Sequence, residues 1–464
     1  MCLVKSSPKR CLPLTRLDVV GIRYGAEVHH IGTVEEASMV EEPSGRARTL
    51  PPEPVTLLAR RRQQREARSS ARILRRAEAG MRRCGGSLAV FALVAAVILP
   101  SVGTFAQVSK LWTRNVHAVV GRWSSADFHT YSANDALLRT YQDFHLVDGY
   151  YLDRTDGLSG FATAWHQFQL MNMLEIAQTL DTVQGVDPGA ALTEAIDAMD
   201  SYWNDSPRGY PAGYDATKNI RLGNPDRYVD DNLWLAQALT RQYARTGNEA
   251  YMLRARQILD LFVSERDVAD GAAWWKVQFP TESNRDKCVV SNATAIPALV
   301  DVYLAGYGDE GFLDIAEQVF GWVQQLRDPE TGLYFDKIRG NGEIDTTLYT
   351  YVQAEVLHSL VRLNAVDAER FPLADAVAFA RLTMDHFATR GGYGISKFDA
   401  IYLRSLIGLA GQVGDDALTA SVQQAIELAK GVIPSSPTEL PDAAASAAII
   451  ALSELPVDRW ADLA

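Results

Sequence analysis

Residues 226–239 read Asp-Arg-Tyr-Val-Asp-Asp-Asn-Leu-Trp-Leu-Ala-Gln-Ala-Leu and place two adjacent acidic residues at the start of an apolar segment. Apolar residues are dense after Asp231, which predicts a helix that is buried on most sides. Paired carboxylates at the beginning of such a helix favour acid–base chemistry on a neutral, hydroxyl-rich substrate. The alternative is a helix cap, because an Asp oxygen accepts hydrogen bonds from the free N–H groups of a first turn. We expect only this capping role for the later pair Asp415-Asp416.

The chain from residue 133 onward repeats one theme, an apolar helix followed by a loop, an amphipathic helix and a turn. The helical segments are rich in Ala, Leu, Gln and Glu, and Gly and Pro separate them. One β-hairpin is predicted from residues 333–338 and 343–345, joined across Gly340-Asn341-Gly342. Twelve helices are predicted, near residues 133–147, 158–181, 188–204, 230–246, 249–266, 288–306, 309–328, 349–365, 371–388, 397–413, 415–431 and 440–455.

Short and long connections alternate between these helices. This alternation predicts an all-α fold, an (α/α)6 toroid of six helical hairpins whose more apolar helices line the inside. The long loops would then gather at the rim where the inner helices begin, and function belongs on those loops and on the first turns. An α-solenoid is the structural alternative.

The N-terminal part of the chain differs from the rest in charge. Residues 1–106 hold 17 Lys and Arg against 9 Asp and Glu, whereas residues 107–464 hold 28 against 48. The acidic body argues against nucleic acid as a partner, because phosphate binding needs a basic face. We expect residues 1–80 to be a disordered or mis-started extension and residues 107–464 to form one large domain.

Residues 81–106 have the pattern of a signal peptide or membrane anchor. Met81-Arg82-Arg83 forms a basic start, residues 88–99 form an apolar core, and Thr104-Phe105-Ala106 offers a cleavage site. The apolar run is shorter than the roughly 20 residues of a stable membrane span. The prediction is a secreted or periplasmic protein, with residues 87–106 as an anchor if the segment is not cleaved.

Cysteine and histidine positions argue against a metal centre. Of the four cysteines only Cys288 lies in the body, so neither an internal disulfide nor a cysteine-based zinc or iron–sulfur site can form there. The eight histidines show no H-x-x-x-H spacing. We therefore expect no metal and no cofactor.

The long loops each carry an aromatic residue, usually beside an amide or a hydroxyl. Aromatic faces stack on the apolar side of sugar rings, and amides and hydroxyls bind sugar hydroxyls. Each residue also has an ordinary structural explanation: Trp274 and Trp275 as core, Asn292 as a helix cap, Gln353 as a simple helix residue. The predicted substrate-binding residues are Tyr228, Trp234, Trp274, Trp275, Asn292, Tyr349, Tyr351, Gln353 and Trp165.

Four blocks, residues 228–234, 273–275, 290–292 and 349–353, occur in the order seen in glycoside hydrolase family 76, which the chain resembles. Residues 396–404 also look like a late block of that family. The resemblance implies an endo-α-1,6-mannanase on an α/α toroid, with Asp230 as nucleophile and Asp231 as general acid/base. Val352, Ala354 and Ala400 depart from the family's usual residues, which are Asn, Gly and Gly.

The chemistry that the resemblance implies is physically reasonable. A retaining glycosidase needs two carboxyl groups about 5–5.5 Å apart, one to attack the anomeric carbon and one to protonate the leaving oxygen. The N–H groups of a helix start favour an ionised nucleophile. Aromatic burial and a neighbouring negative charge raise the proton affinity of the other carboxyl group.

Other functions fit the same scaffold. Sugar 2-epimerases on this toroid use histidines, but His166 and His358 lie in no motif of that kind. Unsaturated glucuronyl hydrolases use aspartates and would favour basic residues near an acidic sugar. A secreted glycan-binding protein without turnover is the alternative from another class. We expect an oligo- or polysaccharide substrate and a monomer.

Overall fold

The computed structural model of the protein describes residues 127–146, 148–155, 160–180, 183–205, 211–218, 226–279, 282–390 and 392–463. They all belong to one compact unit, Ile73–Ala464. The predicted extension at residues 1–80 and the predicted signal segment at residues 81–106 lie outside the described residues. Across the part of the chain that is described, every helix is too short or too polar to span a bilayer.

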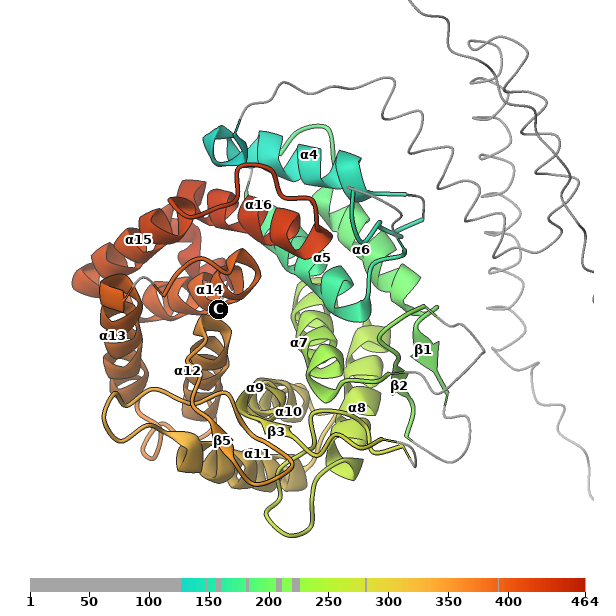
Figure 1. Ribbon diagram of the computed structural model, residues 1–464, viewed down its shortest axis with the longest axis vertical. Helices are drawn as coiled ribbons and strands as arrows, with labels where there is room; N and C mark the ends of the chain where they lie inside the picture. The colour runs from blue at the N-terminus through green and yellow to red at the C-terminus, as the bar shows by residue number, and fades with distance from the viewer. Residues whose placement is uncertain are drawn as a thin grey trace, which may run out of the picture. The chain divides into compact units, whose positions relative to one another are not determined.

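The described chain forms a ring of helical hairpins with an inner and an outer layer (Figure 1). The inner helices are α5 (Ala164–Ala177), α7 (Val229–Thr246), α9 (Val289–Ala293) continued by α10 (Ala295–Leu304), α12 (Thr350–Asn364), α14 (Ser396–Val413) and α16 (Leu440–Glu454). The outer helices are α4 (Ala133–Phe144), α6 (Pro188–Met199), α8 (Glu249–Ser264), α11 (Glu310–Val323), α13 (Leu373–Arg390) and α15 (Asp416–Lys430). Short 3-10 turns are η1 (Phe128–Thr130), η2 (Gln324–Leu326) and η3 (Val457–Leu463).

The ring closes where the two ends of the domain meet. The last inner helix, α16, packs against both the first outer helix, α4, and the first inner helix, α5 (Figure 1). Each of the other inner helices packs against the next one along the chain. A solenoid would leave its first and last repeats apart, so the closure excludes that alternative. The predicted toroid of six hairpins is confirmed.

Burial explains why the two layers differ in sequence. The inner helix α7 buries Leu233, Trp234 and Leu235 in succession, because neighbours surround it on several sides. The outer helix α15 instead buries residues spaced by three or four, including Leu418 and Val422. Each fully buried side chain of this size contributes roughly 1.5–3 kcal/mol through removal of apolar surface from water.

Turns within the hairpins carry the expected end signals. Gly247 and Gly414 follow α7 and α14 at φ 66° and 67°, a left-handed conformation that glycine adopts without steric penalty. Asn248 caps α8 through the Ala250 N–H at 3.2 Å. Asp415 caps α15 by accepting a 2.6 Å bond from the Leu418 N–H, which confirms its predicted role.

The predicted helix over residues 288–306 is interrupted at Thr294, between α9 and α10. Pro297 explains the break, because it has no N–H to bond the carbonyl of Ala293. That carbonyl instead accepts a 3.0 Å hydrogen bond from the Ser359 hydroxyl of α12. A hydrogen bond between two neighbouring inner helices thus replaces the missing bond within the helix.

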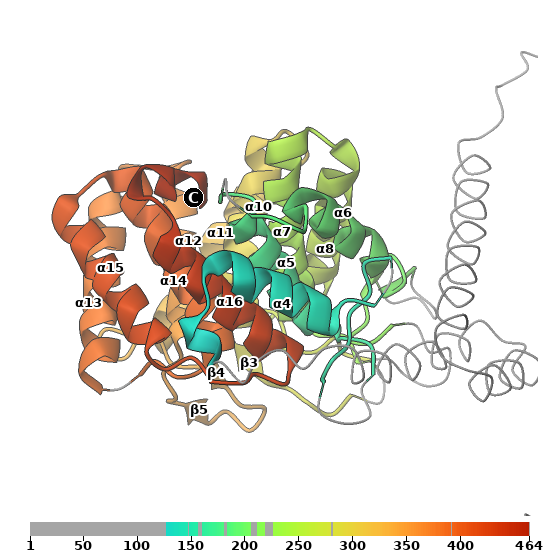
Figure 2. The ribbon, with the colours of Figure 1, turned by 90° about the horizontal axis from the view of Figure 1, so that it is seen from above.

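The strands are only two residues long. β1 (Trp203–Asn204) pairs with β2 (Gly213–Tyr214), and β3 (Lys287–Cys288), β4 (Lys337–Ile338) and β5 (Ile344–Asp345) form an antiparallel sheet in that order. The predicted hairpin is the β4–β5 pair. The other strands were not predicted, because two residues carry no alternating pattern. In Figure 2 the labels β3, β4 and β5 lie at one edge of the ring and the C-terminus at the other.

Candidate active site

Asp230 and Asp231 lie in the first turn of α7, at the rim that carries the short strands. The N-cap residue of this helix is Tyr228, and its side chain makes no capping hydrogen bond. The acidic pair therefore differs from Asp415, whose side chain occupies the N-cap position of α15. Both aspartates are partly exposed, whereas Asn232 and Leu233 directly after them are buried. The pair thus faces the rim from the end of a buried helix.

Two hydrogen bonds hold the carboxylate of Asp230. The indole Nε1–H of Trp275 donates to Oδ2 at 3.0 Å, and the backbone N–H of Asp231 donates to Oδ1 at 3.0 Å. Bonds from uncharged donors favour the ionised carboxylate, and so does the positive end of the α7 helix dipole. Asp230 is therefore the better-stabilised anion of the pair.

Burial raises the pKa of both carboxyl groups, but the remaining causes differ. At Asp230 the hydrogen bonds from Asp231 and Trp275 oppose the rise. At Asp231 the negative charge of Asp230 adds to burial, and the pKa rises well above its ordinary value. The two groups titrate as a pair. Within that pair Asp231 holds the proton more firmly and Asp230 gives it up first.

A third carboxylate, Asp336, lies close to the pair and was not predicted. It directly precedes β4, and burial raises its pKa, while the charge of Lys337 opposes the rise. Its negative charge in turn contributes to the raised pKa of Asp230. Lys337 Nζ lies 3.7 Å from Asp336 Oδ2 and 5.4 Å from the centroid of the Trp275 ring. In the sequence, its place directly after the aromatic residues 334 and 335 of a long loop could have marked it as a candidate site residue.

Three inner helices position the rim loops by the same device. In each of them the residue four positions after the N-cap has a side-chain amide. Its oxygen accepts a hydrogen bond from the backbone N–H of one residue in the preceding loop, and its NH2 group donates to the carbonyl of that same residue. The NH2 group also donates to the carbonyl of the N-cap residue, and we call this arrangement an amide clamp. The three amides are Asn232 on Tyr214 (2.7 and 2.9 Å), Asn292 on Ala273 (2.8 and 3.2 Å), and Gln353 on Tyr334 (2.9 and 2.8 Å).

Two predicted substrate-binding residues, Asn292 and Gln353, belong to these amide clamps. Both side chains are wholly buried, with an exposed fraction of 0%. Their donors and acceptors bond the protein's own backbone, including the carbonyls of Cys288 and Tyr349. The structure therefore places them behind the rim, where they fix the loops that face it.

Trp274 and Trp275, which are adjacent in the loop before β3, have different neighbours. Successive side chains of an extended segment point to opposite sides. Trp275 reaches Asp230, whereas the Trp274 ring lies 4.3 Å from Lys287 Nζ. Lys287 is itself paired with Asp267 and Asp270 at 2.7 and 2.8 Å. Trp275 is thus the tryptophan that contacts the acidic pair.

Trp165 and Trp234 form an aromatic layer below the rim. The Trp234 ring stacks on Phe168 with centroids 5.0 Å apart, and the Trp165 ring lies 5.9 Å from Trp234. Trp234 is only 2% exposed, whereas Trp165 is partly exposed. Of these two predicted residues, Trp165 faces the rim and Trp234 lies beneath it.

The predicted tyrosines lie at the rim beside further aromatic residues. Tyr228 and Trp275 are in contact, with ring centroids 5.1 Å apart. Tyr351 stacks on Phe398 at 4.1 Å, and Tyr349 lies 5.4 Å from the same ring. Phe398 was not among the predicted site residues, although it lies in a block that resembled the family. These partly exposed aromatic side chains offer stacking surfaces near the starts of α7, α12 and α14.

The departures from the family pattern do not face the rim. Val352, Ala354 and Ala400 each have an exposed fraction of 0%. They are packed between inner helices and make no contact with solvent. Among the described residues, no group of three or more His, Cys, Asp or Glu is placed to hold a metal ion.

Residues 189–396 match the family model described as glycosyl hydrolase family 76. The match spans 208 of the 464 residues, from 189 to 396 inclusive. The match confirms the resemblance noted in the sequence blocks and supports a glycoside hydrolase. Among curated proteins, none has a matching sequence.

Solved structures of family 76 proteins have the same fold. An α-mannanase from Bacteroides thetaiotaomicron is 17% identical, with a TM-score of 0.59 over 71% of this chain and 96% of that one. The α-1,6-mannanase of Salegentibacter sp. HEL1_6 is 19% identical, with a TM-score of 0.57 over 70% and 98%. A variant of the latter, described as inactive, has two consecutive aspartates replaced by asparagine and is in complex with α-1,6-mannotriose (18% identical, TM-score 0.56, covering 69% and 97%).

Proposed function

We propose that the chain hydrolyses α-1,6-linked mannan-type glycans with retention of configuration. The observation that carries the proposal is the Asp230-Asp231 pair at the start of an inner helix, with Asp230 held by the Trp275 indole. The inactive Salegentibacter variant supports it, because replacement of two consecutive aspartates accompanies loss of activity in a protein of the same fold. The mannan substrate is inferred from the neighbouring α-1,6-mannanase and from the α-1,6-mannotriose bound to its inactive variant.

The proposed mechanism follows from the different proton affinities of the two carboxyl groups. Asp230, the better-stabilised anion, attacks the anomeric carbon and forms a glycosyl ester, while Asp231 transfers its proton to the leaving oxygen. Asp231 then removes a proton from water, which attacks the same carbon and releases Asp230. After the first step Asp230 is an ester and Asp231 a carboxylate, and the second step returns the pair to one carboxylate and one carboxylic acid.

The test is release of reducing sugar from α-1,6-mannan by the purified protein, its Asp230→Asn and Asp231→Asn variants, and an Asp415→Asn control. The control replaces an aspartate of another acidic pair, which caps α15 and pairs with Arg381 at 3.3 Å, and is no part of the candidate site. We expect turnover in the wild type and the control, and a loss of about a thousandfold or more in both site variants. Proton NMR of the first product should show the α-anomer, which distinguishes retention from inversion.

Other outcomes would change the proposal. Full activity in either site variant would remove that aspartate from the mechanism. Binding of α-1,6-mannotriose without turnover in the wild type would favour the glycan-binding alternative. Turnover of another α-mannoside alone would keep the mechanism and replace the linkage.

We further propose that the protein is exported through residues 81–106. The support is the order of basic start, apolar core and small-residue cleavage site in that segment. N-terminal sequencing of the protein recovered outside the cytoplasm of its native host should begin at Gln107 if the segment is cleaved. Replacement of Leu93 by Arg, within the apolar core, should retain the protein inside the cell.

A further inference from the structure

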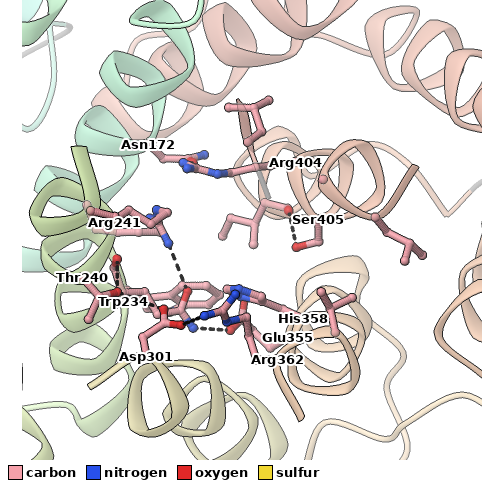
Figure 3. Close-up of a pocket in the computed structure, with 18 of the residues that line it drawn as sticks. Asn172, Trp234, Thr240, Arg241, Asp301, Glu355, His358, Arg362, Arg404 and Ser405 are labelled. Carbon is pink, nitrogen blue, oxygen red and sulfur yellow. Dashed lines mark hydrogen bonds and ion pairs between the residues drawn. The ribbon is translucent and has the colours of Figure 1, made fainter. Parts of the chain in front are cut away.

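A cavity of about 340 Å³ lies inside the ring, away from Asp230 and Asp231. Figure 3 shows its labelled side chains, which come from inner helices on several sides. Trp234 and Arg241 of α7, Asp301 of α10, Glu355 and Arg362 of α12, and Arg404 of α14 are among the residues that line it. Neither aspartate of the proposed catalytic pair belongs to its lining.

The cavity and the acidic pair occupy different levels of the ring. The acidic pair lies in the first turn of α7, whereas Arg241, which lines the cavity, follows Asp231 by ten residues, about 15 Å along the helix axis. Trp234 and Phe168 line the cavity from the side of the rim, and their rings stack on each other. These aromatic side chains lie between the cavity and the rim that carries the acidic pair.

Buried ion pairs organise one wall. Glu175 Oε2 accepts from Arg241 Nη2 at 2.9 Å and from Arg404 Nη1 at 2.6 Å. The two guanidinium groups hold the pKa of Glu175 at about 2, although burial alone would raise it. Arg404 Nη1 also donates to Asn172 Oδ1 at 2.6 Å. One ionised carboxylate therefore serves two guanidinium groups.

The opposite wall does not supply a matching negative charge. Arg362 forms an ion pair with Asp301, and Glu355 accepts a 2.7 Å hydrogen bond from Gln237 Nε2. Burial raises the pKa of Glu355 to about 7, so this group is mostly protonated below neutral pH. His358 is neutral, because burial and the nearby guanidinium groups lower its pKa. Three guanidinium groups thus meet three carboxyl groups, Glu175, Asp301 and Glu355, and burial raises the pKa of the last two.

Two buried donors that line the cavity have no protein partner among the described residues. They are Nδ2 of Asn172 and Nε of Arg362. Asn172 is only 2% exposed, and its Oδ1 is already used by Arg404. Unsatisfied donors in a positively charged cavity call for an acceptor that carries negative charge. We propose that this cavity is a second ligand site, which binds a small oxyanion bearing a phosphate or carboxylate group.

The test is calorimetric titration of the purified protein at pH 6 with inorganic phosphate and, separately, with acetate, each against sodium chloride at equal ionic strength. A ligand that binds only the folded state also raises the thermal midpoint. We expect saturable heat and a rising midpoint with one or both oxyanions and neither with chloride. The stronger of the two responses identifies the preferred group.

Two variants and one control locate the binding. Asn172→Leu removes the unpartnered donor, and Ser405→Leu fills part of the cavity without touching an ion pair. Arg370→Gln removes an exposed guanidinium group paired with Glu317 outside the cavity. Binding should weaken at least tenfold in each folded cavity variant and stay unchanged in the control.

The proposal is overturned if the wild type gives no saturable response to either oxyanion. It is equally overturned if both cavity variants, shown to be folded by circular dichroism, bind as tightly as the wild type, because the ion then sits elsewhere. The wild-type titration decides the matter by itself if a variant does not fold. Hydrolysis of glycans is not measured at any point, so the result is independent of the proposed function.

Discussion

The indole N–H of Trp275 lies 3.0 Å from Oδ2 of Asp230 and joins a rim loop to the first turn of an inner helix. The same loop is fixed from behind by Asn292, whose amide bonds the backbone of Ala273 in both directions. The buried amide of Asn292 thus fixes the loop backbone, and the loop places the indole whose hydrogen bond favours the ionised form of the proposed nucleophile. Each link can be broken separately.

Trp275→Phe removes the donor and keeps most of the aromatic surface. A hydrogen bond to a charged group contributes about 1.5–3 kcal/mol, so its loss should raise the pKa of Asp230 by about one to two units. The nucleophile must be ionised, and the acidic limb of the pH profile of kcat/KM should therefore move to higher pH by that amount. Trp274→Phe, whose ring lies beside Lys287, should leave the limb in place. An unshifted limb in Trp275→Phe would show that the indole does not control Asp230.

Asn292→Ala tests whether the amide clamp positions the rim loop. The substitution leaves the buried N–H and carbonyl of Ala273 without their partner, and we expect a loss of about 3 kcal/mol in the free energy of unfolding. Urea denaturation measures this loss. We also expect kcat to fall more than KM rises, because Trp275 is displaced from Asp230. Asn341→Ala, in an exposed turn, is the matched control and should change neither quantity.

Much of the fold could be predicted from the sequence, because its signals are local and repeated. Apolar density marked the inner helices, and Gly247, Asn248 and Gly414 marked the ends of hairpins. The break at Thr294 was missed, although Pro297 was visible, because α9 and α10 continue in nearly one apolar run. Ring closure follows from the number of hairpins and not from any single residue.

The candidate site was predictable only in part. Asp230, Asp231 and Trp275 lie in dense motifs, and the structure brings them into contact. Burial cannot be deduced from a motif, and Asn292 and Gln353 therefore proved to bond the backbone behind the rim. Asp336 was missed because its proximity to Asp230 depends on the pairing of β3 with β4, two strands of two residues each.

Arg404→Met tests the buried ion pairs inside the ring. Among the described residues it leaves Glu175 with Arg241 as its only cationic partner, and removal of one member of a buried pair typically costs about 3–5 kcal/mol. We expect a loss of about 3 kcal/mol by urea denaturation, with part of it recovered in the double variant Arg404→Met/Glu175→Gln. Arg370→Met breaks an exposed pair with Glu317 and should change stability little. Equal losses in the two single variants would contradict the role assigned to the buried pair.

Glu355→Gln should change how stability depends on pH. In the folded protein burial raises the pKa of Glu355 to about 7, above the ordinary value of 4.5. The folded state therefore binds this proton more tightly than the unfolded state does. The corresponding stabilisation is fully present below pH 4.5 and is lost as the pH rises to about 7.

Gln cannot ionise and can still accept the hydrogen bond from Gln237. Thermal midpoints of the variant should therefore exceed those of the wild type at pH 8 by several degrees and converge with them at pH 5. A constant difference across that range would show that Glu355 is not the titrating group.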